Sequence, residues 1–188
     1  MVNFFRVFLF ILNLAILSSQ STRSIHQIQS EYYKTVPTPP VDKVSVLTGL
    51  DVLLEKKIDL ITGKAIALVT NQTGVDRYGI PNYKRLLALD DIYLKVIFSP
   101  EHGFFGEADK KITYDKKIAD LPKVFSLYGT VRKPTPEMLQ DIDLIIYDIQ
   151  DIGARFYTYI STLGLVMEAA AELQIPVLVL DRPNPIRS

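Results

Sequence analysis

The chain has 188 residues, of which 48% are hydrophobic, and its 21 basic side chains balance its 21 acidic ones. A chain of this size and composition can bury one ordinary hydrophobic core, which excludes a disordered or fibrous protein. Because the charge is balanced and no block of like charges occurs, nucleic acid is not expected as a partner. Cysteine is absent, which excludes disulfides, a lipid anchor on cysteine and zinc–thiolate sites.

The first 21 residues have the layout of a signal peptide. Arg6 precedes an apolar run over residues 7–17, and the small polar residues Ser18, Ser19 and Ser21 follow. An apolar run of about 11 residues is too short for a membrane-spanning helix, which needs about 20. We therefore expect a secreted or bacterial periplasmic protein that keeps no stable membrane anchor after the signal peptide is cleaved.

Residues 22–45 are expected to form an extended linker. The segment contains Pro37, Pro39 and Pro40 and lacks the apolar periodicity of a helix or a strand. The folded domain is therefore predicted over residues 46–188.

Within this domain, apolar runs rich in β-branched residues alternate with segments of helical spacing. The near-continuous apolarity of the runs predicts strands that are buried on both faces of a sheet. The predicted strands are 65–70, 94–99, 144–149 and 176–181, and the predicted helices are 50–58, 83–89, 136–139 and 160–171. This alternation predicts a Rossmann-like, doubly wound α/β fold, with a mainly parallel sheet and helices on both faces.

Polar side chains follow each of the four predicted strands. Ligands of open parallel sheets bind beyond the carboxyl ends of the strands, so these side chains define a candidate site at one edge. In strand order they are Asn71; Glu101 and His102; Asp148, Gln150, Asp151 and Arg155; and Asp181, Arg182 and Asn184.

Glu101 and His102 form the most distinctive pair at this edge. A carboxyl group in a cleft partly closed by Phe104 and Phe105 would have its pKa raised by desolvation and could act as a general acid near neutral pH. The structural alternative is equally compatible with the residues, namely that Glu101 caps the next helix and that His102 is hydrogen-bonded within a loop.

A second acidic centre lies after the third predicted strand, at Asp148 and Asp151. Either carboxylate could take part in the reaction. The structural alternatives are an ion pair between Asp151 and Arg155 and a turn capped by Asp148. A receiver-like domain with Asp148 as phosphoacceptor is a further alternative, but it does not fit an exported protein.

The absence of several motifs limits the classes of reaction that the sequence predicts. The sequence contains no G-x-G-x-x-G motif after the first strand, no Walker A motif and no G-x-S-x-G elbow, and it contains only two histidines. Neither a nucleotide cofactor nor a metal is therefore expected, and carboxylate chemistry remains.

Seven segments resemble, in the same order, the successive motifs of the exo-β-N-acetylmuramidase (NamZ-like) family, also known as DUF1343. The resemblance covers about residues 46 to 186. The segments are 49–54 (GLDVLL), 68–76 (LVTNQTGVD), 100–104 (PEHGF), 126–129 (SLYG), 132–139 (RKPTPEML), 148–159 (DIQDIGARFYTY) and 180–186 (LDRPNPI). Phe105 departs from the pattern, since the family usually has an arginine at this position.

The resemblance implies a two-domain glycoside hydrolase that releases N-acetylmuramic acid from the non-reducing ends of peptidoglycan fragments during cell-wall turnover. This chain would supply only the first domain, so an incomplete enzyme, or a non-catalytic muropeptide-binding module, is also expected. The family's catalytic glutamate falls on Glu101, with His102 beside it, and the second carboxylate would be Asp148, Asp151 or a group in the second domain. The expected substrate-binding residues are Asn71, Gln150, Arg155, Tyr157, Asp181, Arg182 and Asn184.

Overall fold

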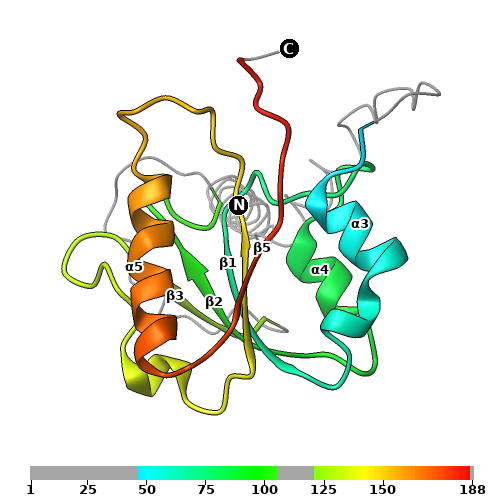
Figure 1. The fold of residues 1–188 in the computed structure, drawn as a ribbon, viewed down its shortest axis with the longest axis horizontal. Helices are drawn as coiled ribbons and strands as arrows, with labels where there is room; N and C mark the ends of the chain where they lie inside the picture. Colours follow the sequence, from blue (N-terminus) through cyan, green and yellow to red (C-terminus); the bar gives the residue numbers. More distant parts are fainter. Residues whose placement is uncertain (1–45, 106–120, 187–188) are drawn as a thin grey trace, which may run out of the picture. The chain divides into compact units, whose positions relative to one another are not determined.

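The computed structural model describes residues 46–105 and 121–186. Its core is a five-stranded sheet in which all neighbouring strands are parallel, in the order β3-β2-β1-β4-β5 (Figure 1). The strands are β1 (Ala65–Thr70), β2 (Tyr93–Ser99), β3 (Lys123–Ser126), β4 (Leu144–Asp148) and β5 (Val177–Val179). The predicted α/β class with a parallel sheet is confirmed.

Helices cover both faces of the sheet (Figure 1). On one face lie α3 (Gly49–Lys56), the 3₁₀ turn η1 (Ile58–Leu60) and α4 (Asn82–Leu87), and on the other lie η2 (Pro136–Leu139) and α5 (Tyr159–Glu172). Thr135 caps η2 as predicted, because its side chain accepts a hydrogen bond from the backbone N–H of Met138.

Strand β1 shows how the sequence builds the two-sided core. Ile66 and Leu68 are fully buried against the α3 and α4 layer, whereas Ala67 and Val69 are fully buried against the α5 layer. Because successive side chains of a strand point to opposite faces, a strand buried on both faces must be apolar at every position. The same alternation decides which polar residues at the end of each strand share a face.

A close crossing of two segments ties the start of the domain to the end of the sheet. The N–H of Gly49 donates to the carbonyl oxygen of Asp181 at 2.7 Å, just after β5. A Cβ atom at Gly49 would come within 2.4 Å of the Asp181 nitrogen, so only glycine fits this crossing.

The structure corrects the predicted elements in two places. Strand β3 was not predicted, because an edge strand of four residues with only one fully buried side chain has no long apolar run. Strand β5 is three residues long, shorter than the predicted 176–181, since Asp181 already belongs to the polar exit of the strand.

Two predictions about the N-terminal region fall on residues that the structure does not describe. The proposed signal peptide (1–21) and linker (22–45) both lie outside the described residues. Among the residues that are described, no helix combines the length and the apolarity needed to cross a membrane.

Candidate active site

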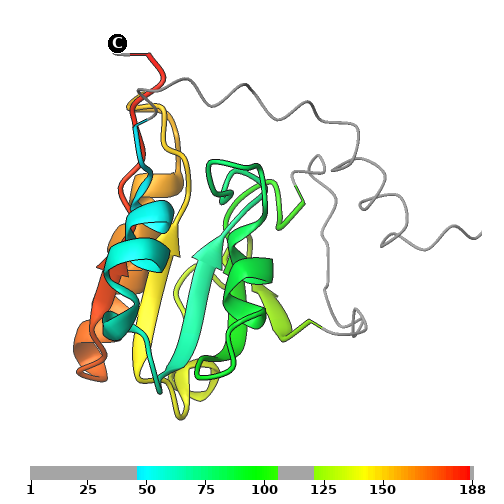
Figure 2. The same cartoon turned by 90° about the vertical axis from the view of Figure 1, so that its right-hand side faces the viewer.

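The carboxyl ends of all five strands lie at one edge of the sheet, as the parallel topology requires (Figure 2). The chain proceeds from β1 to β2 and β3 on one side and then returns to β4 on the other side of β1. This strand order places the switch point between β1 and β4, where Thr70 is in register with Asp148. Crevices at such switch points are the usual ligand sites of open α/β sheets.

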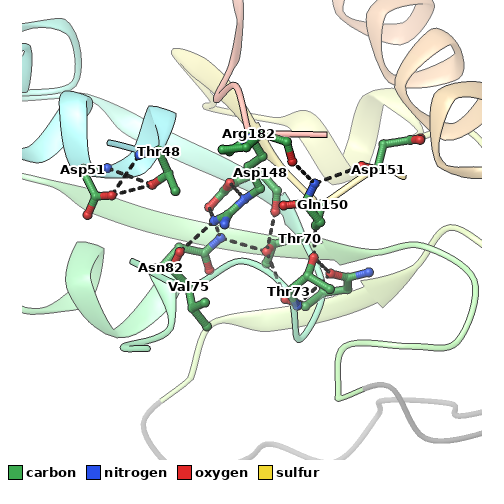
Figure 3. Close-up of polar contacts among 12 residues, drawn as sticks. Thr48, Asp51, Thr70, Thr73, Val75, Asn82, Asp148, Gln150, Asp151 and Arg182 are labelled. Atoms are coloured by element: carbon green, nitrogen blue, oxygen red, sulfur yellow. Dashed lines mark hydrogen bonds and ion pairs between the residues drawn. The ribbon is translucent and has the colours of Figure 1, made fainter. Parts of the chain in front are cut away.

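On the α4 side of this edge, Asp148 lies in a closed ion pair. Its side chain is fully buried, and its two carboxylate oxygens accept hydrogen bonds from Nε and Nη2 of Arg182 at 2.7 and 3.0 Å (Figure 3). The Arg182 side chain is only 6% exposed. Asn82 of α4 adds a third hydrogen bond, from Nδ2 to Oδ2 of Asp148, at 2.7 Å. Both carboxylate oxygens are therefore engaged inside the protein.

Further hydrogen bonds extend this network to the neighbouring backbone. Thr70 Oγ1 donates to the carbonyl oxygen of Asp148 at 2.9 Å and accepts from Asn82 Nδ2 at 2.8 Å. Nη2 of Arg182 also donates to the carbonyl oxygen of Val75 at 2.9 Å (Figure 3). Contrary to expectation, Asp148 is thus closed to a substrate and holds the strand ends together. The phosphoacceptor alternative is wrong for the same reason.

Several of the expected substrate-binding residues instead fasten the exit segment 181–186 to the loop after β4. Gln150 Nε2 donates to the carbonyl oxygens of Asp151 and Pro183, each at 2.9 Å (Figure 3). Asn184 packs so closely on Gly153 that a Cβ atom there would come within 2.4 Å of the Asn184 amide. Like Arg182 and the backbone of Asp181, the side chains of Gln150 and Asn184 therefore hold loops together in this structure.

On the α5 side, Glu101 is partly exposed and is held by hydroxyl groups from two other loops. Thr158 Oγ1 donates to Glu101 Oε2 at 2.7 Å, and the Tyr128 hydroxyl also hydrogen-bonds the carboxyl group. The Thr158 hydrogen bond lowers the pKa of Glu101 below its ordinary value; partial burial opposes this shift, and Tyr128 and the charges of His102 and Arg132 reinforce it. The predicted increase in the pKa of Glu101 by desolvation is therefore wrong for this structure.

A tight turn follows Glu101 and sets the position of its neighbours. His102 and Gly103 both have left-handed backbones, with φ of 68° and 73°. His102 is exposed, whereas Phe104 is only 2% exposed and packs against Tyr83 of α4, with ring centroids 5.1 Å apart. Phe104 therefore belongs to the core and does not close the cleft as predicted.

Asn71 and Tyr159 are buried near Glu101, on the α5 side of the sheet. Tyr159, the first residue of α5, is 7% exposed; burial raises its pKa, and the charges of Tyr157, Glu101 and Asp151 add to the increase. The side chain of Asn71 approaches the Tyr159 hydroxyl and partly offsets this shift. Even so, the buried Asn71 Nδ2 reaches no hydrogen-bond partner of ordinary geometry within residues 46–105 and 121–186.

The loop after β4 brings the remaining expected residues to the rim. Asp151 Oδ1 accepts a hydrogen bond from the N–H of Gly153 at 2.7 Å, and no described contact pairs it with Arg155. Arg155 and Phe156 are exposed, and the Tyr157 ring lies between those of Phe156 and Tyr159, at centroid distances of 5.5 and 5.6 Å.

The candidate site thus has Glu101 at its centre, Asn71 buried near it, and Asp151, Arg155 and Tyr157 in the loop after β4; the sequence indicated all five, and their functional roles stay predictions. Sequence reasoning missed the roles of Tyr128, Thr158 and Tyr159. They lie inside recognised motifs, but a hydroxyl group in a loop carries no signal until its partner is known. Within the described ranges, no cluster of three or more His, Cys, Asp or Glu side chains could hold a metal ion.

The fold and the site define a Rossmann-like α/β domain whose open polar edge is centred on a carboxylate. The chain belongs to the exo-β-N-acetylmuramidase NamZ family, whose N-terminal family model matches residues 66–188. This confirms the resemblance that the sequence motifs indicated.

Known relatives agree with this assignment. The peptidoglycan β-N-acetylmuramidase NamZ of Bacillus subtilis (strain 168) is 47% identical over 146 residues, which are 76% of this chain and 35% of the relative. Crystal structures of two DUF1343 family proteins from Bacteroides fragilis NCTC 9343 are also similar. The first has a TM-score of 0.68 and 47% sequence identity, and the match covers 74% of this chain and 35% of that protein. The second has a TM-score of 0.61 and 34% sequence identity, and the match covers 76% of this chain and 36% of that protein. The chain therefore spans about a third of the length of these relatives.

Proposed function

We propose that this chain is the Rossmann-like part of a glycosidase that releases N-acetylmuramic acid from the non-reducing ends of peptidoglycan fragments. Family membership and the name of the Bacillus subtilis relative support the substrate class. The observation that carries the proposal is Glu101, a partly exposed carboxylate held at the switch-point edge by side chains from two other loops.

The environment of Glu101 bears on its role in glycoside cleavage. Glycosidases use one carboxyl group as the proton donor and a second as the nucleophile or base next to an oxocarbenium-like centre. The lowered pKa keeps Glu101 ionised in the free domain, and the ionised form can stabilise that centre or attack it. A general-acid role would require the substrate and the rest of the enzyme to exclude water and so raise the pKa of Glu101.

The rim supplies groups for recognising the sugar. The exposed guanidinium of Arg155 can bind the lactyl carboxylate that distinguishes N-acetylmuramic acid from N-acetylglucosamine, because arginine forms bidentate pairs with carboxylates. Asn71, which is buried next to Tyr159, acts behind the rim, where its side chain can orient the Tyr159 hydroxyl. Asp151, a partly exposed carboxylate in the loop after β4, is the candidate for the second catalytic group within this chain, and the carboxylate of Asp181 is also exposed at this edge.

The decisive experiment is Glu101→Gln in a chimera in which this chain replaces the matching segment of the Bacillus subtilis relative. Glutamine keeps the size of the side chain but neither carries a negative charge nor donates a proton as an acid. We expect the release of N-acetylmuramic acid from a chromogenic substrate to fall about 10² to 10⁴-fold, with unchanged thermal unfolding.

Glu137→Gln is the matched control. Glu137 is also a glutamate whose pKa is lowered by a threonine hydrogen bond, here from Thr135, but it lies in η2, between β3 and β4. This variant should keep full activity. Near-normal turnover by Glu101→Gln would exclude Glu101 from the reaction and direct attention to Asp151.

A muropeptide-binding module is the second candidate function, favoured by the lowered pKa of Glu101, which leaves the carboxyl group without the proton that a general acid must donate. The turnover of the chimera distinguishes the two functions. A binding module would show chemical-shift changes with an N-acetylmuramic acid disaccharide in the chain itself, while the chimera would show no turnover.

We also propose that the protein is exported, since residues 1–21 have the layout of a signal peptide and the proposed substrate lies outside the cytoplasmic membrane. N-terminal sequencing of the protein recovered from the periplasm or medium should begin after residue 21. Recovery of a protein that begins at Met1 would contradict the proposal.

A further inference from the structure

We infer that Thr158 is a positioning residue, which holds the Glu101 carboxylate in its reactive orientation through the hydrogen bond from Oγ1 to Oε2. The inference rests on the proposed function, in which Glu101 acts on the substrate. The effect of Thr158 on the reaction is expected to pass through Glu101.

Three threonines of this chain stand at the N-cap position, directly before a helix. Thr48, Thr135 and Thr158 are the N-cap residues of α3, η2 and α5. The first two have extended backbones, with ψ of 163° and 160°, and their side chains accept hydrogen bonds from backbone N–H groups of their helices, as N-cap threonines commonly do. Thr158 has ψ of −9° and makes no such cap hydrogen bond.

Helix α5 begins at a residue whose backbone is already helical, so Thr158 does not make the cap contact that Thr48 and Thr135 make. The hydroxyl of Thr158 instead donates to Glu101, which lies 57 residues earlier in the chain, at 2.7 Å. Local rules that are broken in favour of a distant contact are characteristic of functional sites.

The surroundings of Glu101 make this contact decisive for its orientation. The loop after β3 contributes the Tyr128 hydroxyl and the charge of Arg132, and His102 contributes charge from the turn that carries Glu101. Helix α5 contributes Thr158, and Tyr159 lies near enough to interact electrostatically with Glu101. Among the hydrogen bonds and charges that favour the ionised carboxylate, the hydrogen bond from Thr158 has the largest effect.

The N-terminus of α5 adds to this arrangement. The helix has 14 residues and no acidic side chain in its first turn. A carboxylate near the start of a helix is stabilised by the free N–H groups and by the helix dipole. Glu101, in the loop after β2, can supply the negative charge that the first turn of α5 lacks, and the Thr158 hydrogen bond keeps the carboxylate there.

The test compares Thr158→Val with Thr158→Ser in the full chain. Valine keeps the branched shape but removes the hydroxyl, whereas serine retains a donor. The pKa of Glu101 is measured by an NMR titration of its ¹³C-labelled carboxyl group. We expect a higher pKa in Thr158→Val and a nearly normal pKa in Thr158→Ser. Thr158→Val should stay folded and melt only a few degrees lower, because it loses one exposed hydrogen bond and no cap hydrogen bond.

Thr135→Val is the control for a general effect of removing a threonine hydroxyl from an N-cap. It removes the hydrogen bond to Glu137, so it should raise the pKa of Glu137 and leave that of Glu101 unchanged. Thr158→Ala, which adds no new methyl contact, provides a second hydroxyl-free variant if valine disturbs the fold.

In the chimera, Thr158→Val should lower kcat about 10-fold, the approximate effect of losing one hydrogen bond to a charged group, with little change in KM. The acidic limb of the pH–rate profile should move to higher pH, and Thr158→Ser should restore both properties. An unchanged Glu101 titration and an unchanged pH profile in folded Thr158→Val would overturn the inference. If Glu101→Gln abolished turnover in the same series, the proposed function would nevertheless stand.

Discussion

Glu101 and Asp148 are carboxylates from neighbouring regions of one sheet edge, yet their environments differ because they face opposite layers. Asp148 follows the alternation of Leu144 and Ile146 toward the α4 side, where Arg182 neutralises it. Glu101 lies beyond β2 near the start of α5 and keeps an exposed surface. A buried carboxylate with two occupied oxygens serves the fold, whereas a partly exposed carboxylate with a fixed orientation can serve a reaction.

Asp148→Asn tests the structural role of the buried pair. The substitution keeps the size of the side chain but leaves the charge of Arg182 buried without a counter-ion, which typically costs about 3–5 kcal/mol. We expect the free energy of unfolding in urea to fall by this order. Asp90→Asn, at an exposed aspartate, should leave it nearly unchanged. Equal stability of Asp148→Asn and the wild type would show that the pair does not hold the strand ends together.

At the scale of the elements, strands β1, β2 and β4 could be predicted from sequence because burial on both faces demands an apolar residue at nearly every position. Strand β3 could not be predicted. It pairs only with β2, and its residues alternate between exposed Lys123 and buried Val124, a pattern too short to recognise over four residues.

The meeting of the polar strand ends at one edge was predictable from the sequence, but the contacts among their side chains were not. Parallel strands bring their carboxyl ends to one edge, so the sequence placed Asn71, Glu101 and Asp148 together correctly. The side on which each of them lies depends on the alternation within each strand and on the layer that it faces. The contact between Thr158 and Glu101 depends on a tertiary approach of α5 that no local pattern encodes.

The stability that the start of α3 gives to the fold is expected to depend on pH. Thr48 and Asp51 form a capping box, and Asp51 also accepts from the N–H of Arg77 at 3.1 Å. Burial alone would raise the pKa of Asp51, but the hydrogen bonds from Arg77 and Thr48 outweigh it and hold the pKa below the ordinary value of 3.8.

A carboxylate with a lowered pKa in the folded state contributes stability above its unfolded pKa and loses it as the pH falls through the folded value. We therefore expect Asp51→Asn to reduce stability at pH 7 and to flatten the loss of stability below pH about 4. Urea unfolding between pH 7 and pH 2 measures both effects. Asp59→Asn, at an exposed position in η1, should retain the wild-type slope; a wild-type slope in Asp51→Asn would refute the assignment.

At the scale of the whole molecule, the exit segment after β5 is joined to the domain by many contacts. Arg182 binds Asp148 and the carbonyl oxygen of Val75, Pro183 accepts from Gln150, and Asp181 accepts from Gly49. Figure 2 shows this segment, in red, rising from β5 past the carboxyl ends of the strands. The loop after β4, which carries Asp151 and Arg155, is therefore held in place in part by the segment that follows the last strand.

This arrangement predicts how the 188-residue chain behaves by itself. Glu101 is partly exposed, Arg155 is exposed and Phe156 is 82% exposed, so water reaches the α5 side of the site freely. Catalytic electrostatics are weakened by bulk water, because solvent screens the charges that stabilise the transition state. We expect the chain to bind an N-acetylmuramic acid disaccharide weakly, with NMR shifts at Arg155 that Arg155→Ala removes, and to release at least 10²-fold less product than the chimera. Turnover by the chain at the rate of the chimera would show that these residues suffice for catalysis and that exclusion of water by further protein is unnecessary.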